Sequence, residues 1–397
     1  MAVLDGIRVL DLSRVFAAPL ATQMLADLGA EVWKIESFSG DDTRKWGDHV
    51  FNAFNRGKRG LSVNLKHERA QRLVQRLAEK ADVLVENFKT GDLARYGLGY
   101  ETLSKVNERL IYVSLTGFGQ TGPRKHQPGY DTIIQAMAGA MHSTGDPDGP
   151  PSRIGIAWVD VMAGLTTALG VMSALLERKS SGKGQHIDLA LFDVGLMALV
   201  DVAQDYLQNG NIQRRMGNIT RNLSPAQTFE TSDGWIVLAV GNDGQFKKLC
   251  MEVGLPDLAS DPLFTSNHLR VQNRTALTEI LKPVIKQATR QSMVERLTKA
   301  GIPASPILNC AEALNDPQAL ARNAIWDLSE EEDSHFRVLA NPLRHMSRTP
   351  ATPSAPPPAV GQHTYEVLGD ELQLDRSELD QLVADGVIYN GESKQHG

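Results

Sequence analysis

The sequence predicts an α/β protein whose larger domain is a doubly wound, Rossmann-like parallel sheet and whose smaller domain is of the α+β type. Three observations support this prediction. Strand-like runs alternate with helical patterns near the N-terminus, as in βαβ units. Those runs are apolar on both faces, which is typical of strands covered by helices on each side. Beyond about residue 225 the composition shifts to one hairpin followed by several helical segments.

Short loops connect the predicted elements of the larger domain. In chain order they are a strand at 6–12, a helix at 17–28, strands at 31–36 and 60–65, a helix at 70–80, and strands at 81–88 and 110–115. Strands separated in this way by helices are expected to lie parallel. Residues 130–204 are mostly helical, with one further strand at 185–191.

The smaller domain begins with a predicted hairpin at 228–240, because two β-rich runs flank Ser232, Asp233 and Gly234. Helical segments follow at 245–253, 275–289 and 291–300. We therefore predict a large domain of residues 1–205 and 330–397, a small domain of 225–322, and linkers at 206–224 and 323–358. Proline-rich residues 350–358 are expected to form a stiff extended connector.

The composition argues against several classes of protein. Among 397 residues, 42% are hydrophobic and 22% charged, which is typical of a globular chain. The net charge of −6 argues against a nucleic-acid partner. Cys250 and Cys310 are too few for a disulfide framework, and no cysteine or histidine cluster has zinc-ligand spacing. We therefore expect no metal and a reducing, cytoplasmic location.

No membrane segment is expected. The N-terminus lacks a basic region followed by an apolar run, so it does not indicate a secretory signal. The longest uncharged stretch, residues 161–176, is shorter than the ~20 residues of a spanning helix. The first turn of the predicted sheet, residues 13–19, contains no glycine, which argues against a dinucleotide site.

Asp160 is the most informative carboxylate, because it stands at the head of this long apolar stretch. A structural interpretation is that Asp160 caps the helix and complements its dipole. A functional interpretation is that a carboxylate among apolar neighbours attacks an activated acyl group. Both can hold at once. Two further features stay open: Trp46 could pack or face a ligand, and the loop at 241–244 could be a plain turn or a flexible lid.

Taken in order, eight segments resemble the family III CoA-transferases, which include formyl-CoA:oxalate and carnitine CoA-transferases. Each segment alone is weak, whereas their order along nearly the whole chain is specific. The segments are LDLSRV at 10–15, AAP at 17–19, LGAEVWKIE at 28–36, GDDTR at 40–44, VENF at 85–88, TGFGQTGP at 116–123, GYD at 129–131 and TSDGW at 231–235.

The resemblance implies roles for individual residues. Asp160 falls on the position of the family's catalytic aspartate. Trp46 matches a position near the acyl pocket, and Gly241 to Gly244 match the family's mobile loop. The segments similar to the family's CoA-binding ones contain Phe16, Ala17, Val63, Lys66, Asn87, Phe88, Lys89, Arg95, Tyr130 and Asp131. Coenzyme A is thus expected as the acyl-CoA substrate, with no permanently bound cofactor, and the family's interlocked homodimer is expected as the assembly.

Two departures from the family pattern affect the expected CoA contacts. Ala18 stands where the family motif usually has glycine, and residues 37–38 are Ser and Phe where some relatives carry arginine. The basic side chain for the adenosine end is therefore left open among Lys34, Arg44 and Lys89. A distal substrate carboxylate is expected to pair with Arg14, Arg44 or Arg153, because a guanidinium can bind it in bidentate fashion.

The function implied is transfer of CoA from an acyl-CoA donor to a free carboxylic acid, through an aspartyl anhydride and an aspartyl-CoA thioester. Succinyl-CoA is the expected donor, and short dicarboxylates such as glutarate, itaconate or malate are the expected acceptors. One alternative is an acyl-CoA racemase of the same superfamily. Those enzymes resemble this chain but carry His after the Gly of the motif at 129–131, where Tyr130 is a poor base at neutral pH. A non-catalytic acyl-CoA-binding protein is the other alternative.

Overall fold

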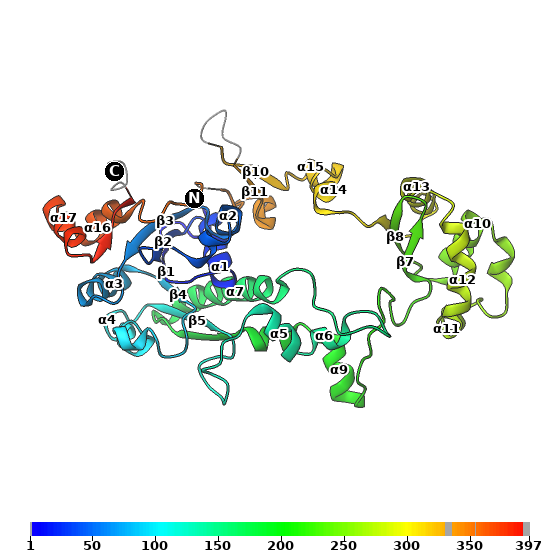
Figure 1. The fold of residues 1–397 in the computed structure, drawn as a ribbon, viewed down its shortest axis with the longest axis horizontal. Coiled ribbons are helices and arrows are strands. Elements are labelled where there is room, and N and C mark those ends of the chain that lie inside the picture. Colours follow the sequence, from blue (N-terminus) through cyan, green and yellow to red (C-terminus); the bar gives the residue numbers. More distant parts are fainter. Residues whose placement is uncertain (1, 330–335, 354, 392–397) are drawn as a thin grey trace. The chain divides into compact units, whose positions relative to one another are not determined.

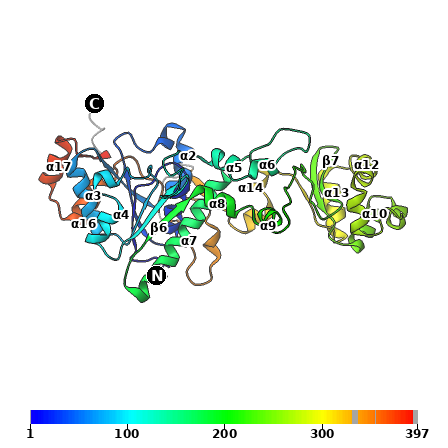
Figure 2. The same ribbon diagram turned by 90° about the horizontal axis from the view of Figure 1, so that it is seen from below.

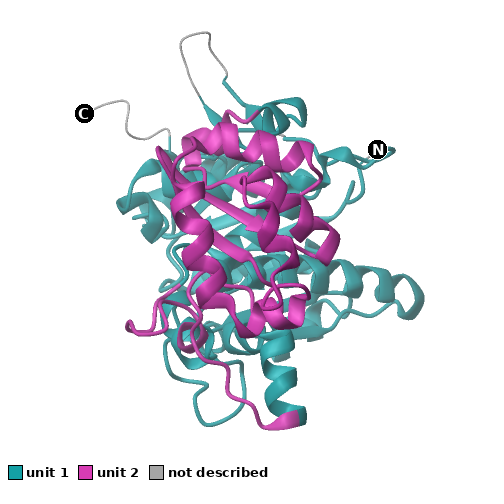
Figure 3. Ribbon diagram, turned by 90° about the vertical axis from the view of Figure 1, so that its right-hand side faces the viewer, with its two compact units in different colours: residues 1–140, 154–208, 317–397 teal, residues 141–153, 209–316 magenta. Residues whose placement is uncertain are grey.

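The computed structural model describes residues 2–329, 336–353 and 355–391. They belong to two compact units, coloured separately in Figure 3: unit 1 comprises 1–140, 154–208 and 317–397, and unit 2 comprises 141–153 and 209–316. Residues 141–153 are thus part of unit 2, whereas the predicted ranges give them to the large domain. Those domain ranges stay a prediction. Residues 330–335 and 392–397, and Ser354 of the predicted connector, lie outside the described residues.

Unit 1 is built on a seven-stranded sheet with the order β12-β3-β2-β1-β4-β5-β6. Its edge strand β12 (Ile388–Tyr389) runs antiparallel to β3. The other six strands are parallel: β1 (Arg8–Asp11), β2 (Glu31–Glu36), β3 (Lys58–Val63), β4 (Val83–Glu86), β5 (Ile111–Thr116) and β6 (His186–Ala190). This confirms the predicted large parallel sheet. The order 3-2-1-4-5-6 places the ligand crevice of such sheets between β1 and β4, where the strand order reverses.

Helices cover both faces of this sheet (Figure 1). Strands β1, β2, β4 and β5 send residues into two different cores: Val9 of β1 belongs to one and Leu10 to the other. The Val9 core contains α1 (Ala17–Asp27), α5 (Asp131–Met137), α7 (Trp158–Ser181) and α8 (Leu191–Met197). The Leu10 core contains α3 (Glu68–Lys80), α4 (Tyr100–Val106), α16 (Thr364–Leu372) and α17 (Arg376–Ala384). This two-sided burial explains why the strand sequences are apolar on both faces.

Helix α7 is the longest helix of unit 1. Among the described residues, it alone is long and apolar enough to cross a membrane by length and composition. A core helix of a globular protein passes the same test, and α7 packs against α1, α5 and α8 within unit 1. The expectation that the chain spans no membrane stays a prediction.

Shorter elements complete unit 1 and its boundary with unit 2. They are η1 (Asp42–Lys45), α2 (Asp48–Asn55), η2 (Ala94–Tyr96), α6 (Ala140–Ser143), α9 (Val200–Asn209), α15 (Pro317–Ala321), β10 (Ile325–Asp327), β11 (Arg337–Leu339) and η4 (Pro342–His345). Strands β10 and β11 form an antiparallel pair inside the predicted linker at 323–358. Strands of three residues are too short to produce a recognisable alternation in the sequence.

Unit 2 contains a three-stranded antiparallel sheet of β7 (Ala226–Thr231), β8 (Gly234–Ala239) and β9 (Ala304–Pro306). This confirms the predicted hairpin, whose turn lies between Thr231 and Gly234. Helices α12 (Arg274–Ile285) and α13 (Arg290–Lys299) pack on the sheet (Figure 2). The remaining elements are α10 (Asp243–Glu252), η3 (Pro256–Ser260), α11 (Asn267–Gln272) and α14 (Cys310–Leu314).

Candidate active site

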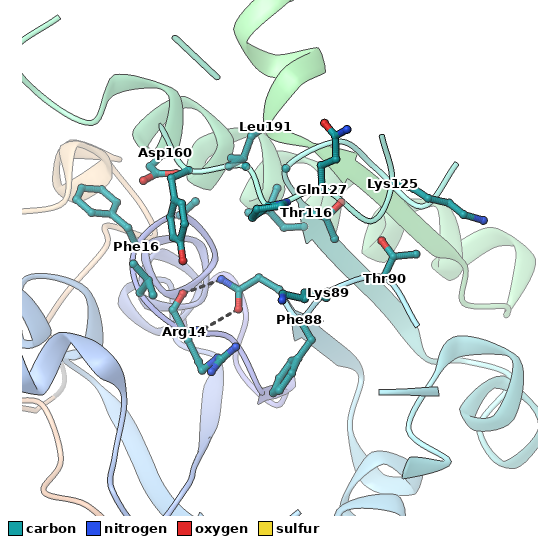
Figure 4. A pocket seen from close by; sticks show the side chains of 18 of the residues that line it. Arg14, Phe16, Phe88, Lys89, Thr90, Thr116, Lys125, Gln127, Asp160 and Leu191 are labelled. Carbon is teal, nitrogen blue, oxygen red and sulfur yellow. Dashed lines mark hydrogen bonds between the residues drawn. The ribbon is translucent and has the colours of Figure 1, made fainter. Parts of the chain in front are cut away.

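A pocket in unit 1 lies at the carboxyl ends of β1, β4 and β5, at the place where the strand order reverses. It is lined by residues 14–17 after β1, 87–90 after β4, and 115–117 and 125–130 after β5, together with Asp42, Asp160 and Leu191. Figure 4 shows Asp160 and Phe16 on one side of this pocket and Lys89 and Thr90 on another. This is the position at which open α/β sheets bind ligands.

Asp160 lies in the first turn of α7, and the N-cap residue of that helix is Ala157. The structural interpretation of Asp160 as the cap itself is therefore wrong. Burial raises the pKa of Asp160 to about 7, and the neighbouring Asp131 carboxylate adds to the rise. A carboxylate with weak solvation is a stronger nucleophile than one in water, so this environment suits attack on a carbonyl carbon.

Asp131, in the first turn of α5, caps α7 from outside that helix. Its Oδ1 accepts the backbone N–H of Val159 at 2.9 Å and that of Asp160 at 3.3 Å. Gln135 Nε2 donates to Asp131 Oδ2 at 2.7 Å, while its Oε1 accepts the backbone N–H of Ile154. Because Ala157 offers no side-chain acceptor, Asp131 provides the N-terminal capping that α7 otherwise lacks.

The pocket wall carries three cations: Arg14, Lys89 and Lys125. The guanidinium of Arg14 lies 4.8 Å from the centre of the Phe88 ring, and one of its nitrogens is 3.9 Å from Asp42. Guanidinium and ammonium groups at a pocket edge suit a diphosphate or a carboxylate. Against the two carboxylates of the lining, Asp42 and Asp160, these three cations leave an excess of positive charge, which favours an anionic ligand.

Eight of the residues singled out from the sequence line this one pocket. They are the proposed nucleophile, one candidate for the distal carboxylate and six of the expected CoA contacts: Asp160, Arg14, Phe16, Ala17, Asn87, Phe88, Lys89 and Tyr130. They come from four separate segments of the chain. The sheet topology brings these segments together at the ends of neighbouring strands.

Four expected CoA contacts do not line the pocket. Val63 is buried in the Leu10 core, and Lys66 is exposed. Arg95 forms an ion pair with Asp92. Asp131 is buried beneath the wall, where it caps α7. Their roles in CoA binding stay predictions.

Trp46, the expected acyl-pocket residue, ends η1 and is 57% exposed. It does not line the pocket, whereas Asp42 of the same short helix does. Its role at an acyl site stays a prediction.

The structure separates the basic candidates. Lys34 is fully buried against Asp41, and Arg44 donates to both carboxylate oxygens of Glu36. Neither of these two residues lines the pocket, whereas Lys89 and Arg14 do. Arg153 belongs to unit 2.

The loop with Gly241 and Gly244 belongs to unit 2 and leads into α10. Asn242 caps that helix by accepting the Gln245 N–H, and the Gly241 N–H donates to Gln245 Oε1. Asp243 forms an ion pair with the buried Arg270. Within unit 2 the segment is therefore a capped helix start, and its role over an acyl site stays a prediction.

Sequence reasoning missed Gln135, Lys125 and Asp42. Gln135 follows Asp131 by four residues, a spacing at which side chains meet on a helix, so that pair could have been found. The other two lie in loops without a periodic pattern. Among the described residues, no group of three or more His, Cys, Asp or Glu side chains could hold a metal ion.

The comparisons with known proteins now decide the family. A family model described as CoA-transferase family III matches residues 4–364. The chain belongs to CoA-transferase family III. This family III chain is 40% identical over 388 residues to the succinate–glutarate CoA-transferase of Agrobacterium fabrum, covering 94% of this chain and 97% of that relative. It is 43% identical over 329 residues to the acetyl-CoA:oxalate CoA-transferase of Acetobacter aceti, covering 81% and 85%.

A solved structure supports the same assignment. The crystal structure of a CAIB/BAIF family protein from Brucella suis superposes on the family III chain with a TM-score of 0.87 and 42% identity, covering 93% of this chain and 99% of that one. The predicted family is thereby confirmed, and with it the enzyme class of a CoA-transferase.

Proposed function

We propose that this enzyme transfers CoA from succinyl-CoA to a short dicarboxylic acid, and that Asp160 is the nucleophile. The observation that carries the proposal is the placement of Asp160, a poorly solvated carboxyl group, on the wall of a cation-lined pocket at the sheet's reversal point. A carboxylate suits exchange between two acids, because it can form an anhydride with either of them.

In the first half of the proposed reaction, an ionised Asp160 oxygen attacks the carbonyl carbon of the donor thioester. The C–S bond breaks, and CoA leaves as the thiolate. The thiolate then attacks the Asp160 carbonyl carbon of the mixed anhydride. The donor acid leaves with the oxygen that bridged the anhydride, and Asp160 becomes a CoA thioester.

In the second half, a carboxylate oxygen of the acceptor acid attacks the Asp160 thioester and expels the CoA thiolate. The thiolate attacks the acceptor carbonyl of the new anhydride, which yields the product acyl-CoA and restores the Asp160 carboxylate. The two halves of the reaction balance without a proton, a metal ion or a redox group. Backbone N–H groups of the loop at 241–244 are proposed to stabilise the oxyanions.

The proposed acids follow from charge and from the relatives. The two relatives described above are named for glutarate and oxalate as acids, and one is named for succinate. Each of these acids has a second carboxylate. A guanidinium binds such a group in bidentate fashion, and Arg14 is the arginine that lines the pocket.

A homodimer is the proposed assembly, as the family resemblance implies. The apolar stripe of α7 leaves Leu165, Leu169 and Leu176 exposed, with relative exposures of 42%, 67% and 69%. Exposed apolar patches of this kind mark interaction surfaces. A second copy of this chain is the proposed partner, and light scattering of the purified protein would test it: a monomer at micromolar concentration would contradict the proposal.

The activity test compares the parent enzyme with Asp160→Asn, using succinyl-CoA and a panel of free dicarboxylic acids, with mass spectrometry of the acyl-CoA products. We expect exchange by the parent and none by the variant. Asp193→Asn, at an exposed position on α8, is the matched control and should retain exchange. Clear turnover by Asp160→Asn would contradict the assignment. Deuterium uptake from D2O at the α-carbon without a second acid would instead indicate a racemase.

A further inference from the structure

The turn at residues 13–16 joins β1 to α1 and supplies Arg14, Val15 and Phe16 to the pocket wall. Val15 has a φ angle of 71°, in the left-handed region that is costly for a β-branched residue. A backbone conformation of this kind persists only where surrounding contacts hold it. The contacts that hold this turn therefore shape the pocket.

Asn87, at the start of the loop after β4, holds one side of the turn. Its Oδ1 accepts the backbone N–H of Arg14 at 2.8 Å, and its Nδ2 donates to the backbone carbonyl of Arg14 at 2.7 Å. Dashed lines mark both bonds at Arg14 in Figure 4. Both ends of the Asn87 amide are thus engaged by the main chain of one residue.

The buried pair of Lys34 and Asp41 holds the other side. The two Asp41 carboxylate oxygens each lie 3.3 Å from the Val15 backbone nitrogen, which donates to them. Lys34 Nζ lies 3.3 Å from Asp41 Oδ2 and donates to the Ser13 carbonyl at 2.9 Å. Both charged side chains have no exposed surface.

The charge state of this pair follows from its surroundings. Burial alone would raise the pKa of Asp41, but the Lys34 ammonium and the donors of Thr43 hold that pKa below its ordinary value. The Asp41 carboxylate is therefore ionised beside Lys34, and breaking a buried ion pair is costly. It forms a rigid anchor for Ser13 and Val15.

We propose that Asn87 and the Lys34–Asp41 pair are positioning residues, which hold the strained turn in the conformation that binds the CoA part of the substrate. The inference rests on the proposed function, because it takes CoA as the ligand. In this proposal Asn87 affects CoA binding through the turn, whereas the family resemblance implied that Asn87 contacts CoA directly. A turn fixed before the ligand arrives reduces the ordering that binding requires.

Val15→Gly provides the decisive test, because glycine adopts a positive φ angle without steric cost. The experiment is a double-mutant cycle of Asn87→Ala and Val15→Gly in the full chain, with free CoA as the probe and calorimetry as the readout. With valine at position 15, Asn87→Ala is expected to weaken CoA binding about 10-fold through loss of two hydrogen bonds. In the Val15→Gly background the same change is expected to weaken it less than about 3-fold.

Asn107→Ala is the matched control. Asn107 also bonds main-chain groups of unit 1, namely the carbonyls of Ala78 and Ala81, but it does not line the pocket. This variant should bind CoA as the parent does. Thermal melting of all variants reports whether each remains folded.

An equal loss of affinity in both backgrounds would mean that Asn87 contacts CoA itself, and it would overturn the proposal. Unchanged affinity of Asn87→Ala would overturn it as well. If the parent chain binds no CoA, the proposed function fails, and hydrogen exchange of the ligand-free protein decides the inference. If Asn87 holds the turn, peptide 13–17 should exchange faster in Asn87→Ala than in the parent, and unchanged exchange contradicts the inference.

Discussion

Asp131 accepts the backbone N–H of Asp160 at 3.3 Å, through the same oxygen that accepts the Val159 N–H at 2.9 Å. One carboxylate thus caps the helix that presents the other. This arrangement has two consequences. The cap fixes the main chain of the proposed nucleophile, and the like charge contributes to the raised pKa of Asp160.

Asp131→Asn should separate these two effects. The amide oxygen still accepts the N–H groups, but the negative charge is gone, so the pKa of Asp160 should fall. Since burial is the largest cause of the rise to about 7, the pKa should remain above its ordinary value. Attack requires ionised Asp160, so the acid limb of the kcat profile should move to lower pH. An unmoved acid limb in a folded variant would show that the Asp131 charge does not act on the nucleophile.

Glu86 should make the free energy of unfolding depend on pH. Burial raises its pKa from 4.5 to about 7, while its Oε2 accepts the Phe88 N–H at 2.8 Å. Between these pH values the folded state keeps a proton that the unfolded state has lost. The contribution of Glu86 to the free energy of unfolding is therefore complete below pH 4.5 and is lost as pH rises through 7. The free energy of unfolding falls by up to about 3 kcal/mol over this range.

Glu86→Gln stays neutral, so its stability relative to the parent should increase from pH 5 to pH 8. Urea unfolding at both pH values measures this difference. Glu79→Gln, at an exposed position on α3, is the control and should show no such change. A pH-independent difference for Glu86→Gln would contradict the account of its environment.

Lys58→Met should destabilise unit 1 strongly. Lys58 Nζ donates to Asp11 Oδ2 and Asn55 Oδ1, both at 2.9 Å, and neither charged side chain has exposed surface. Removing one partner of a buried ion pair costs about 3–5 kcal/mol. Denaturant unfolding should show this loss, and Asp11→Asn combined with Lys58→Met should cost less than the sum of the single changes. Additive costs would mean that the pair is not coupled.

The sequence predicted the parallel sheet well because its strands are buried on both faces. The predicted strand at 31–36 has the bounds of β2, since Val32, Trp33 and Ile35 are strand-forming residues. The ion-pair partners of the lysines inside β2 and β3 could not be predicted from the sequence. Lys34 and Lys58 are buried charges whose partners, Asp41 and Asp11, are set by the tertiary fold rather than by local pattern.

The site residues named from the sequence came from the family resemblance, and the fold explains why several of them meet. Phe16, Asn87 and Tyr130 line the pocket with Asp160 because the topology brings the carboxyl ends of β1, β4 and β5 together. The cap on α7 could not be predicted, since Asp131 and Val159 are 28 residues apart and no pattern links them.

Oxygen transfer to Asp160 tests the central claim most directly. In the proposed reaction, the acceptor carboxylate attacks Asp160, and the last step leaves the bridging acceptor oxygen on that residue. With an acceptor acid labelled with oxygen-18, mass spectrometry of the peptide containing Asp160 should show one labelled oxygen after a single turnover and two after many. If the parent enzyme forms labelled product acyl-CoA while this peptide stays unlabelled, the acids react with each other directly and Asp160 is not the nucleophile.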